Sequence, residues 1–332
     1  MLCNNNNTIK EDLQVLKDVN EKGKVINWKD KKCKTQYIAD SYFRIAEKLD
    51  SKHYEKKSLR VLSCGDNLEF RRYHHDNSLK LNKADFCKDR LCPMCNLRRS
   101  LKVYGQVSKT MDKLQEQGNY RFLFLTLTCR NVFDEDLEEQ LNELFSAFDR
   151  FMKRRKLKKS VKGWFRALEI THNHDLDTYH PHFHVILVVE PQYFKKSDLY
   201  ISQAEFTDYW KDSLNINYTP VVNIKAFKSA TNKDMSKSIA ETAKYTMKDS
   251  DLIVYDDNTY TDRIVLTIDN ALYRRRLCAF GGVLKKIHSD LKLDDSVEGD
   301  LINVSCDDIR PELEFHIEKY GWCFGFNNYY RK

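Results

Sequence analysis

The sequence predicts an α+β protein, in which an antiparallel sheet carries helices on one face, with a cysteine-rich region before it and a mainly helical region after it. Two observations predict the sheet. From residue 120, apolar segments of strand length are interleaved with segments whose apolar residues recur at helical spacing, and two strand segments are close enough to pair as a hairpin. A third observation, four cysteines within residues 64–95, predicts a separate region ahead of the sheet.

Residues 1–119 form the first predicted region. The first sixty or so are rich in Lys, Asp and Asn, with one helical pattern around Tyr42. The cysteine-rich segment 64–95 follows, and then a helix from Arg98 to Gln117, which Gly118 would end because glycine commonly follows the last helical residue. We expect a partly ordered arm, a cysteine-rich segment and a helix.

Residues 120–250 carry the regular alternation. The expected elements are a strand at 121–128, a helix over about 137–155, strands at 164–171 and 180–189, a helix opening at Ser202, a strand at 219–227 and a helix at 236–247. Ser202 and Glu205 have the spacing of a capping box, in which the two residues satisfy each other's backbone N–H groups. This order is typical of one antiparallel sheet with helices on one face, which leaves the other face free for a site.

Residues 251–332 form the third predicted region. A short strand-like stretch at 263–268 precedes a helix near 271–287, and an aromatic tail at 320–330 shows no recognisable motif. We expect a mainly helical region, and the sequence indicates no role for it.

The most informative segment is His-Pro-His-Phe-His at 180–184, which runs directly into an apolar strand. Side chains alternate along a strand, so His182 and His184 share one face. If strand 164–171 pairs with this strand in one-to-one register, Glu169 lies opposite His184. Two imidazoles and a carboxylate suit Mn²⁺ or Mg²⁺ with open positions for a substrate. The alternative is that all three are ordinary polar residues on an exposed sheet face.

The predicted helix at 236–247 offers a nucleophile. Helical spacing puts Glu241 and Tyr245 on one face, with Lys248 almost one turn further. A phenol with a pKa of about 10 is a poor nucleophile at neutral pH, so its attack needs a neighbouring cation or a metal-polarised phosphate. The alternative is an amphipathic helix whose Tyr245 is half-buried.

Three blocks together resemble the HUH single-strand endonucleases, and within them the rolling-circle replication initiators of small bacterial plasmids. The blocks are Phe124–Thr128, His180–His184 and Glu241–Lys248. They occur in the initiators' order and cover roughly residues 120 to 250. Relaxases, a sister group, place the tyrosine before the histidine motif, whereas this chain places it after.

The resemblance implies a mechanism and partners. It implies that His182 and His184 bind the metal, and that Tyr245 attacks a DNA phosphate to leave a free 3′-hydroxyl and a 5′-phosphotyrosine. Glu241 matches a glutamate that is implied to activate water, so that the last cleavage ends by hydrolysis. Glu169 as third ligand rests on the pairing argument. The implied partners are plasmid origin DNA, as a single-stranded or hairpin nick site, and a host helicase and polymerase.

The cysteine-rich segment has the spacing of a structural zinc site. The expected ligands are Cys64, Cys87, Cys92 and Cys95. His74 or His75 could replace Cys64, and the alternative to a metal site is a group of buried thiols without a ligand. Arg98 and Arg99, which follow shortly after Cys95, would extend a basic surface suited to DNA phosphates.

Composition limits the class of protein. The net charge of +7 favours an anionic partner without proving one. Basic blocks at 98–102 and 153–159 contrast with an acid-rich stretch at 290–314. The sequence has neither an apolar run of about 18 residues nor a signal-peptide core, so we expect a cytoplasmic protein with no membrane partner. Its ten cysteines should therefore be reduced thiols or metal ligands.

These observations favour a site-specific enzyme that nicks and joins single-stranded DNA to start plasmid replication. Two alternatives remain open. A transposase of the same superfamily is the catalytic one, although such chains are usually shorter and lack the cysteine region. A zinc-dependent DNA-binding regulator without chemistry is the other, and there the basic blocks would account for DNA binding.

Overall fold

The computed structural model describes residues 14–19, 23, 25–227, 239–243, 246–304 and 312–332. The protein has the predicted α+β fold, with two antiparallel sheets instead of one. It contains two compact units: unit 1 comprises residues 1–98 and 301–332, and unit 2 comprises residues 99–300. Unit 1 therefore joins the two ends of the sequence.

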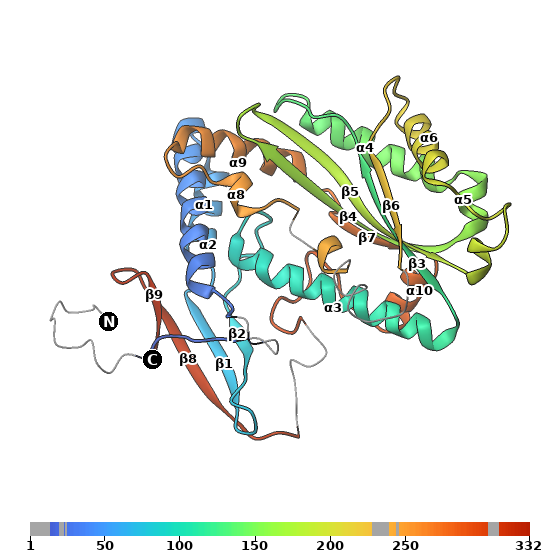
Figure 1. Ribbon diagram of the computed structural model, residues 1–332. Coiled ribbons are helices and arrows are strands. Elements are labelled where there is room, and N and C mark those ends of the chain that lie inside the picture. Colours follow the sequence, from blue (N-terminus) through green and yellow to red (C-terminus); the bar gives the residue numbers. More distant parts are fainter. Residues whose placement is uncertain (1–13, 20–22, 24, 228–238, 244–245, 305–311) are drawn as a thin grey trace. The chain divides into compact units, whose positions relative to one another are not determined.

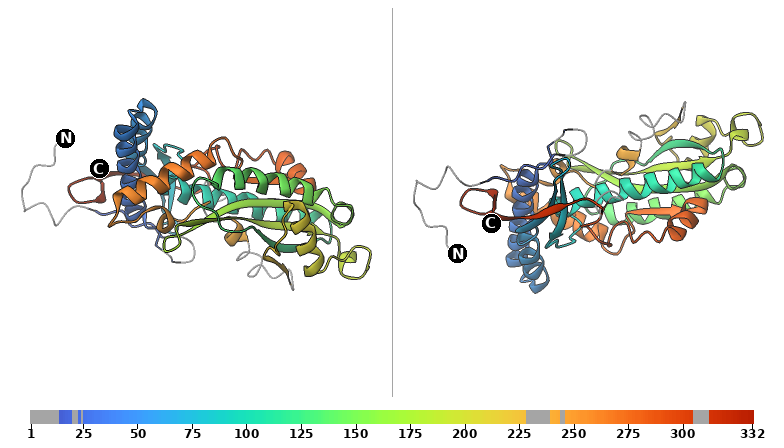
Figure 2. Two further views of the ribbon diagram at one scale, coloured as in Figure 1. Left: turned by 90° about the horizontal axis from the view of Figure 1, so that it is seen from above. Right: turned by 90° about the horizontal axis from the view of Figure 1, so that it is seen from below.

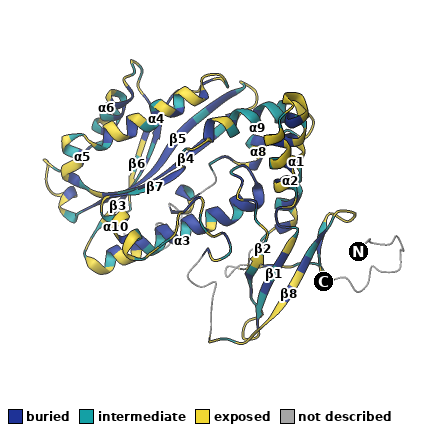
Figure 3. Ribbon diagram, turned by 180° about the vertical axis from the view of Figure 1, so that it is seen from behind, coloured by how far each residue is buried: buried dark blue, intermediate teal, exposed yellow. Residues whose placement is uncertain are grey.

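Unit 1 contains a four-stranded sheet in the order β2-β1-β8-β9 (Figure 1). Its elements are α1 (Trp28–Leu49), α2 (Lys52–Leu62), β1 (Asn67–Tyr73), β2 (Leu79–Ala84), β8 (Phe315–Cys323) and β9 (Asn328–Arg331). The ring of Phe70 on β1 meets Trp28 of α1 and Tyr320 of β8 edge-on, at centroid distances of 5.8 and 6.0 Å. These contacts tie the C-terminal strands to the N-terminal helix. The aromatic tail without a motif is therefore part of a sheet, while the first residues of β8 are exposed (Figure 3).

Helix α3 (Pro93–Gln117) begins in unit 1 and continues into unit 2. The predicted start at Arg98 was five residues too late, because Pro93 is suited to the first turn of a helix. Cys95 consequently lies in the first turn of α3 rather than in a loop.

Unit 2 contains a five-stranded antiparallel sheet in the order β6-β3-β5-β4-β7. Its elements are β3 (Arg121–Thr128), α4 (Leu137–Met152), α5 (Arg155–Ser160), β4 (Val161–Asn173), β5 (Thr178–Val189), η1 (Pro191–Phe194), α6 (Gln203–Leu214), β6 (Val222–Ala226), α8 (Asp249–Leu252), α9 (Asn258–Leu272), β7 (Cys278–Gly281) and α10 (Gly282–Asp290). The long hairpin of β4 and β5 appears from two sides in Figure 2, and Figure 3 shows these strands as mostly buried.

Helix α4 covers one face of this sheet. Its apolar residues recur at helical spacing as predicted, and the ring of Phe148 meets Trp164 of β4 and Phe183 of β5 edge-on at 5.0 and 5.5 Å. On the opposite face, at the β7 edge, a Cβ on Gly163 would lie 2.8 Å from Val283 of α10. Helices therefore contact both faces at this edge, beyond the one face predicted.

Several expected elements are confirmed, and two near the C-terminus were wrong. The capping box of Ser202 and Glu205 is present at the start of α6. The expected strand at 263–268 is instead the middle of α9, whose start is capped by Asp257. The expected helix near 271–287 is divided into the end of α9, β7 and α10. Residues 273–281 interrupt it, and α10 begins at Gly282, which has φ +57° and a position where a Cβ would lie 2.3 Å from the carbonyl oxygen of Lys162.

Three of the six basic residues at 153–159 pair with acids of unit 2, among them Arg154 with Asp212 at 3.3 Å. Lys156 contacts Glu205 at 2.6 Å, and Lys159 contacts Asp198 at 2.6 Å. The positive charge of this block is therefore partly neutralised within the protein. No helix in the described parts of the chain has both the length and the apolar character needed to cross a membrane.

Candidate functional site

The hairpin of β4 and β5 brings Glu169, His182 and His184 together. The cross-strand partner of Glu169 is His182, not His184 as predicted. The strands run to Asn173 and Thr178, so the connecting loop is shorter than expected and the register differs by two residues. Because side chains alternate with period two, a shift of two residues keeps Glu169 on the histidine face. The predicted grouping therefore forms, although the predicted pair was wrong.

The geometry of this cluster fits a divalent cation. The Oε2 atom of Glu169 lies 2.7 Å from Nε2 of His184 and 3.4 Å from Nε2 of His182. Two ligands at right angles around an ion, each about 2.1 Å from it, would be about 3.0 Å apart. The ligand atoms of the three residues all lie within 4.8 Å of one another, so one ion can reach all of them. Three protein ligands leave coordination positions open.

The surroundings fix which histidine nitrogen faces the cluster. Nδ1 of His182 donates to the backbone oxygen of His180 at 3.1 Å, which leaves Nε2 with a free lone pair. Nδ1 of His184 lies 3.4 Å from the hydroxyl of Thr126, and Phe124 stacks on the same ring at 5.5 Å. The histidine strand β5 itself and the neighbouring strand β3 thus hold the two rings in place.

The charge of Glu169 also favours a cation. Burial alone raises the pKa of this carboxyl, but the interactions with the imidazoles of His182 and His184 outweigh burial and hold the pKa below its ordinary value. Glu169 is therefore a carboxylate at neutral pH although only 7% of it is exposed. A buried carboxylate beside two imidazoles is a donor set for a hard or borderline metal ion.

A second ligand cluster lies in unit 1. Its members are Cys64, Cys87, Cys92 and Cys95, all buried. The Sγ atom of Cys64 is 3.5 Å from those of Cys92 and Cys95, and the Sγ atoms of Cys87 and Cys95 are 3.6 Å apart. Thiolates at the corners of a tetrahedral zinc site are about 3.8 Å apart when each Zn–S bond is about 2.3 Å. The fourth member is Cys64, so His74 and His75 as alternatives were wrong; His74 instead lies 3.0 Å from His316.

Backbone N–H groups point at these sulfur atoms. The amide of Lys88 lies 3.2 Å from Sγ of Cys95, and the amide of Cys87 lies 3.4 Å from Sγ of Cys64. Burial raises the pKa of Cys92, but hydrogen bonds from the other three thiols outweigh burial and lower it, while the pKa of Cys64 and the pKa of Cys95 are raised. Thiolates supported by backbone N–H groups are suited to a structural metal.

A comparison with known proteins identifies the family. A family model described as "Replication protein" matches residues 78–330. A "Protein rep" of Bacillus amyloliquefaciens is 39% identical over 97% of this chain and 98% of its own length. A "Protein rep" of Streptococcus pneumoniae serotype 2 is 40% identical over 89% of this chain and 88% of its own length. No solved structure gives a significant match.

The chain belongs to the replication protein family. This finding confirms the predicted resemblance to plasmid replication initiators, and it supports a role in starting plasmid replication. Both ligand clusters are therefore parts of a replication protein.

The nucleophile segment of this replication protein is described only in part. Tyr245 lies outside the described residues. Residues 239–242 are helical and Glu241 is half-buried. The predicted helix does not continue to Lys248, which is exposed and precedes α8. The prediction that Lys248 lies on the same helix face as Glu241 was therefore wrong. After this helix, the backbone oxygen of Thr246 accepts a hydrogen bond from the amide of Ile170 on β4, at 2.6 Å.

Two structural features were not predicted from the sequence. Lys32 is fully buried, and its Nζ atom donates to the backbone oxygens of Leu62 and Cys64, at 2.6 and 2.9 Å, so it fixes the loop that carries Cys64.

Arg98 and Arg99 are each only 6% exposed, and they donate to backbone oxygens within their own units. The expected basic surface at these two arginines was therefore wrong. A lysine in an amphipathic helix gives no sequence signal of burial.

Proposed function

We propose that this replication protein is a site-specific single-strand DNA endonuclease and strand transferase that initiates rolling-circle plasmid replication. Residues 120–250 are its nuclease domain, and Tyr245 is its nucleophile. The supporting observation is the hydrogen bond between Thr246 and Ile170. It attaches the residue directly after Tyr245 to the residue directly after Glu169, on the strand that carries one of the three metal ligands.

The reaction follows from the residues of this chain. The phenol oxygen of Tyr245 forms a bond to the phosphorus of the scissile phosphate, and the bond from phosphorus to the 3′-oxygen breaks. The phenol loses a proton and the departing 3′-oxygen gains one, so the products are a 5′-phosphotyrosine and a free 3′-hydroxyl. Glu169, His182 and His184 would hold Mn²⁺ or Mg²⁺, which when bound neutralises charge on the phosphate oxygens.

Termination requires a second acceptor for the DNA. Glu241 lies four residues before Tyr245, and its carboxylate takes a proton from water so that the last cleavage ends by hydrolysis. The free 3′-hydroxyl is extended by a host polymerase while a host helicase unwinds the plasmid. The origin DNA is the substrate, and the protein acts in the cytoplasm.

The cysteine cluster has a separate role in this proposal. Cys64, Cys87, Cys92 and Cys95 hold a structural Zn²⁺ that organises unit 1. Four thiols fill the usual coordination of zinc, so no position is left for a substrate. The zinc therefore supports the fold and takes no part in the nicking reaction.

Nicking of supercoiled plasmid tests the nucleophile. Purified protein and Mn²⁺ are incubated with a plasmid that carries the DNA flanking this gene, and open-circular product is measured. Tyr245→Phe removes the attacking oxygen and should reduce nicking to background. Tyr273→Phe is the control, since Tyr273 is 66% exposed in the same unit. If the protein were a DNA-binding regulator without catalytic activity, neither the wild type nor either variant would nick the plasmid. Nicking by Tyr245→Phe would refute the assignment of Tyr245 as the nucleophile.

Product analysis tests the role of Glu241. Glu241→Ala should nick at the wild-type rate but release the DNA about 10²- to 10⁴-fold more slowly, because the general base for hydrolysis is missing. Covalent protein–DNA adduct should accumulate on a denaturing gel. Glu139→Ala, a substitution at an exposed glutamate of α4, is the control. Normal release by Glu241→Ala would count against this role.

A further inference from the structure

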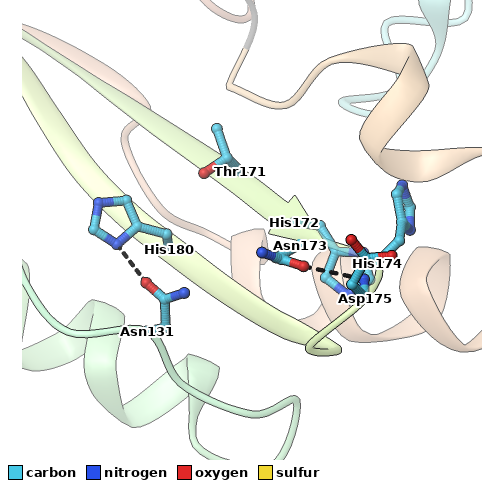
Figure 4. Close-up of a pocket in the computed structure, with 7 residues that line it drawn as sticks. All are labelled: Asn131, Thr171, His172, Asn173, His174, Asp175 and His180. Carbon is cyan, nitrogen blue, oxygen red and sulfur yellow. Dashed lines mark hydrogen bonds between the residues drawn. The ribbon is translucent and has the colours of Figure 1, made fainter.

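A polar groove lies on the hairpin beside the Glu169–His182–His184 cluster. Its volume is about 660 Å³, which is within the range of about 300–1,000 Å³ typical of ligand sites. Figure 4 shows its lining, with His180 and Asn131 at one side and Asn173 and Asp175 near the hairpin tip. The metal-ligand cluster does not include these residues.

The groove continues the face that carries the ligand cluster. Glu169 pairs with His182, and the next pair on the same face toward the hairpin tip is Thr171 with His180. Two residues along a strand span about 6.7 Å, which is close to one nucleotide step along an extended DNA strand. A phosphate held at the cluster would therefore have its neighbouring nucleotide over Thr171 and His180.

Hydrogen bonds fix the orientation of the His180 ring. The side-chain nitrogen of Asn131 donates to the hydroxyl of Thr178 at 3.2 Å, which directs the amide oxygen of Asn131 toward His180. That oxygen lies 2.8 Å from Nδ1 of His180, so Nδ1 carries the proton and donates. Nε2 of His180 is consequently a hydrogen-bond acceptor.

The Asn173 amide is oriented in a similar way. Its oxygen accepts from the backbone amides of Asp175 and Leu176, both at 3.0 Å. Its NH₂ group is therefore left as a donor at the tip end of the groove. Thr171, the cross-strand partner of His180 on β4, contributes a hydroxyl that can donate or accept. The groove thus offers an acceptor, a donor and a hydroxyl on one face of the hairpin (Figure 4).

These groups match a nucleobase better than a phosphate. The residues found to line the groove in the described part of the chain include no Lys or Arg, and one of them, Asp175, is an acid. Phosphates are usually bound by positive charge, whereas base edges are read by donors and acceptors in a fixed arrangement. An imidazole ring such as that of His180 can also stack on a base.

We propose that this groove binds the base of the nucleotide next to the scissile phosphate and distinguishes it from other bases. His180 and Asn173 select the base because Nε2 of His180 can only accept a hydrogen bond and the NH₂ group of Asn173 can only donate one. The hydroxyl of Thr171 adds a hydrogen bond to either a donor or an acceptor on the base. The proposal rests on the proposed function for the position of the scissile phosphate. It adds a determinant of sequence specificity to that function.

Binding of short fluorescent homopolymers of dA, dC and dT, measured by anisotropy in EDTA, tests this proposal without cleavage. The wild-type protein should prefer one homopolymer over the weakest by about tenfold. His180→Ala and Asn173→Leu should each bring the three affinities to within about twofold of one another. The isosteric Thr171→Val should reduce the difference between the three affinities by a smaller amount than either of these variants. His53→Ala, a substitution at an exposed histidine of α2, should keep the wild-type preference.

Two results would overturn the proposal: equal affinity of the wild-type protein for all three homopolymers, or an unchanged preference in both His180→Ala and Asn173→Leu. Thermal unfolding of each variant shows whether it is folded. If His180→Ala and Asn173→Leu are unstable, Thr171→Val still tests the groove, because valine keeps the shape of the threonine side chain. Absence of nicking in the plasmid assay would refute the proposed function instead, since the anisotropy measurement requires no reaction.

Discussion

The two ligand clusters differ in how many ligands they offer and in where those ligands come from. The cysteine cluster has four buried thiols drawn from the turn after α2, the loop after β2 and the first turn of α3. The Glu169–His182–His184 cluster has three ligands on one hairpin. A closed set from distant segments ties a fold together, whereas an open set on rigid strands leaves room for a substrate. We therefore expect loss of the first cluster to unfold unit 1 and loss of the second to remove chemistry.

The largest expected effect is on the cysteine cluster. Cys92→Ser should abolish zinc binding and unfold unit 1, because zinc binding to such sites supplies roughly 10–16 kcal/mol of folding free energy at pH 7. Zinc content by elemental analysis and thermal unfolding measure the two consequences. Cys33→Ser, a substitution at a half-buried cysteine of α1 outside the cluster, should keep one zinc per chain. A Cys92→Ser protein with full zinc content and wild-type stability would contradict the assigned role.

A smaller change in stability, with a large change in activity, is expected at the other cluster. His184→Ala removes one of three ligands and should lower nicking by on the order of 10²- to 10³-fold, similar to the loss of other groups that stabilise transition-state charge. Its unfolding free energy should change by only about 1–2 kcal/mol. Plasmid nicking in Mn²⁺ measures the loss of activity, and denaturant unfolding in EDTA measures the change in unfolding free energy. If His184→Ala unfolded as Cys92→Ser is expected to, the contrast between the clusters would fail.

Sequence periodicity predicted the elements of unit 2 better than those of unit 1. The strand at 121–128 and the helix of α4 have strong periodic patterns, and both are present. The strands β1 and β2 were missed because their apolar residues are few and are interrupted by charged ones. The pairing of β1 with β8 joins residues about 250 positions apart, and no local pattern indicates such a contact.

The site was predicted to the extent that it depends on local alternation. His182, His184 and Glu169 share a face because of strand geometry, which the sequence specifies. Their exact pairing depends on the length of the hairpin loop, and the sequence left that length uncertain. Burial of Arg98 and Arg99 depends on backbone oxygens from residues about 200 positions later, so the expected basic surface could not be tested from the sequence.

The smallest expected effects come from two threonines that support the two clusters in matching ways. The hydroxyl of Thr126 lies 3.4 Å from Nδ1 of His184, and the hydroxyl of Thr35 lies 3.6 Å from Sγ of Cys92. Thr35 also accepts a hydrogen bond from the backbone amide of Met94, at 3.2 Å, near the start of α3. Valine has nearly the same shape as threonine, so Thr→Val removes the hydroxyl at each site with little change in volume.

Thr126→Val and Thr35→Val should separate activity from stability. Thr126→Val should lower nicking or Mn²⁺ affinity by about 10- to 100-fold, because loss of a partner that orients a metal ligand has this effect, while stability changes little. Thr35→Val should cost about 1–3 kcal/mol of unfolding free energy, because the buried amide of Met94 loses its partner, while nicking per folded molecule stays at the wild-type rate. Nicking kinetics and denaturant unfolding of both variants measure this pattern. Equal effects of the two substitutions on both quantities would mean that the clusters do not have separate roles, because a closed structural site and an open catalytic site respond differently to the same chemical change.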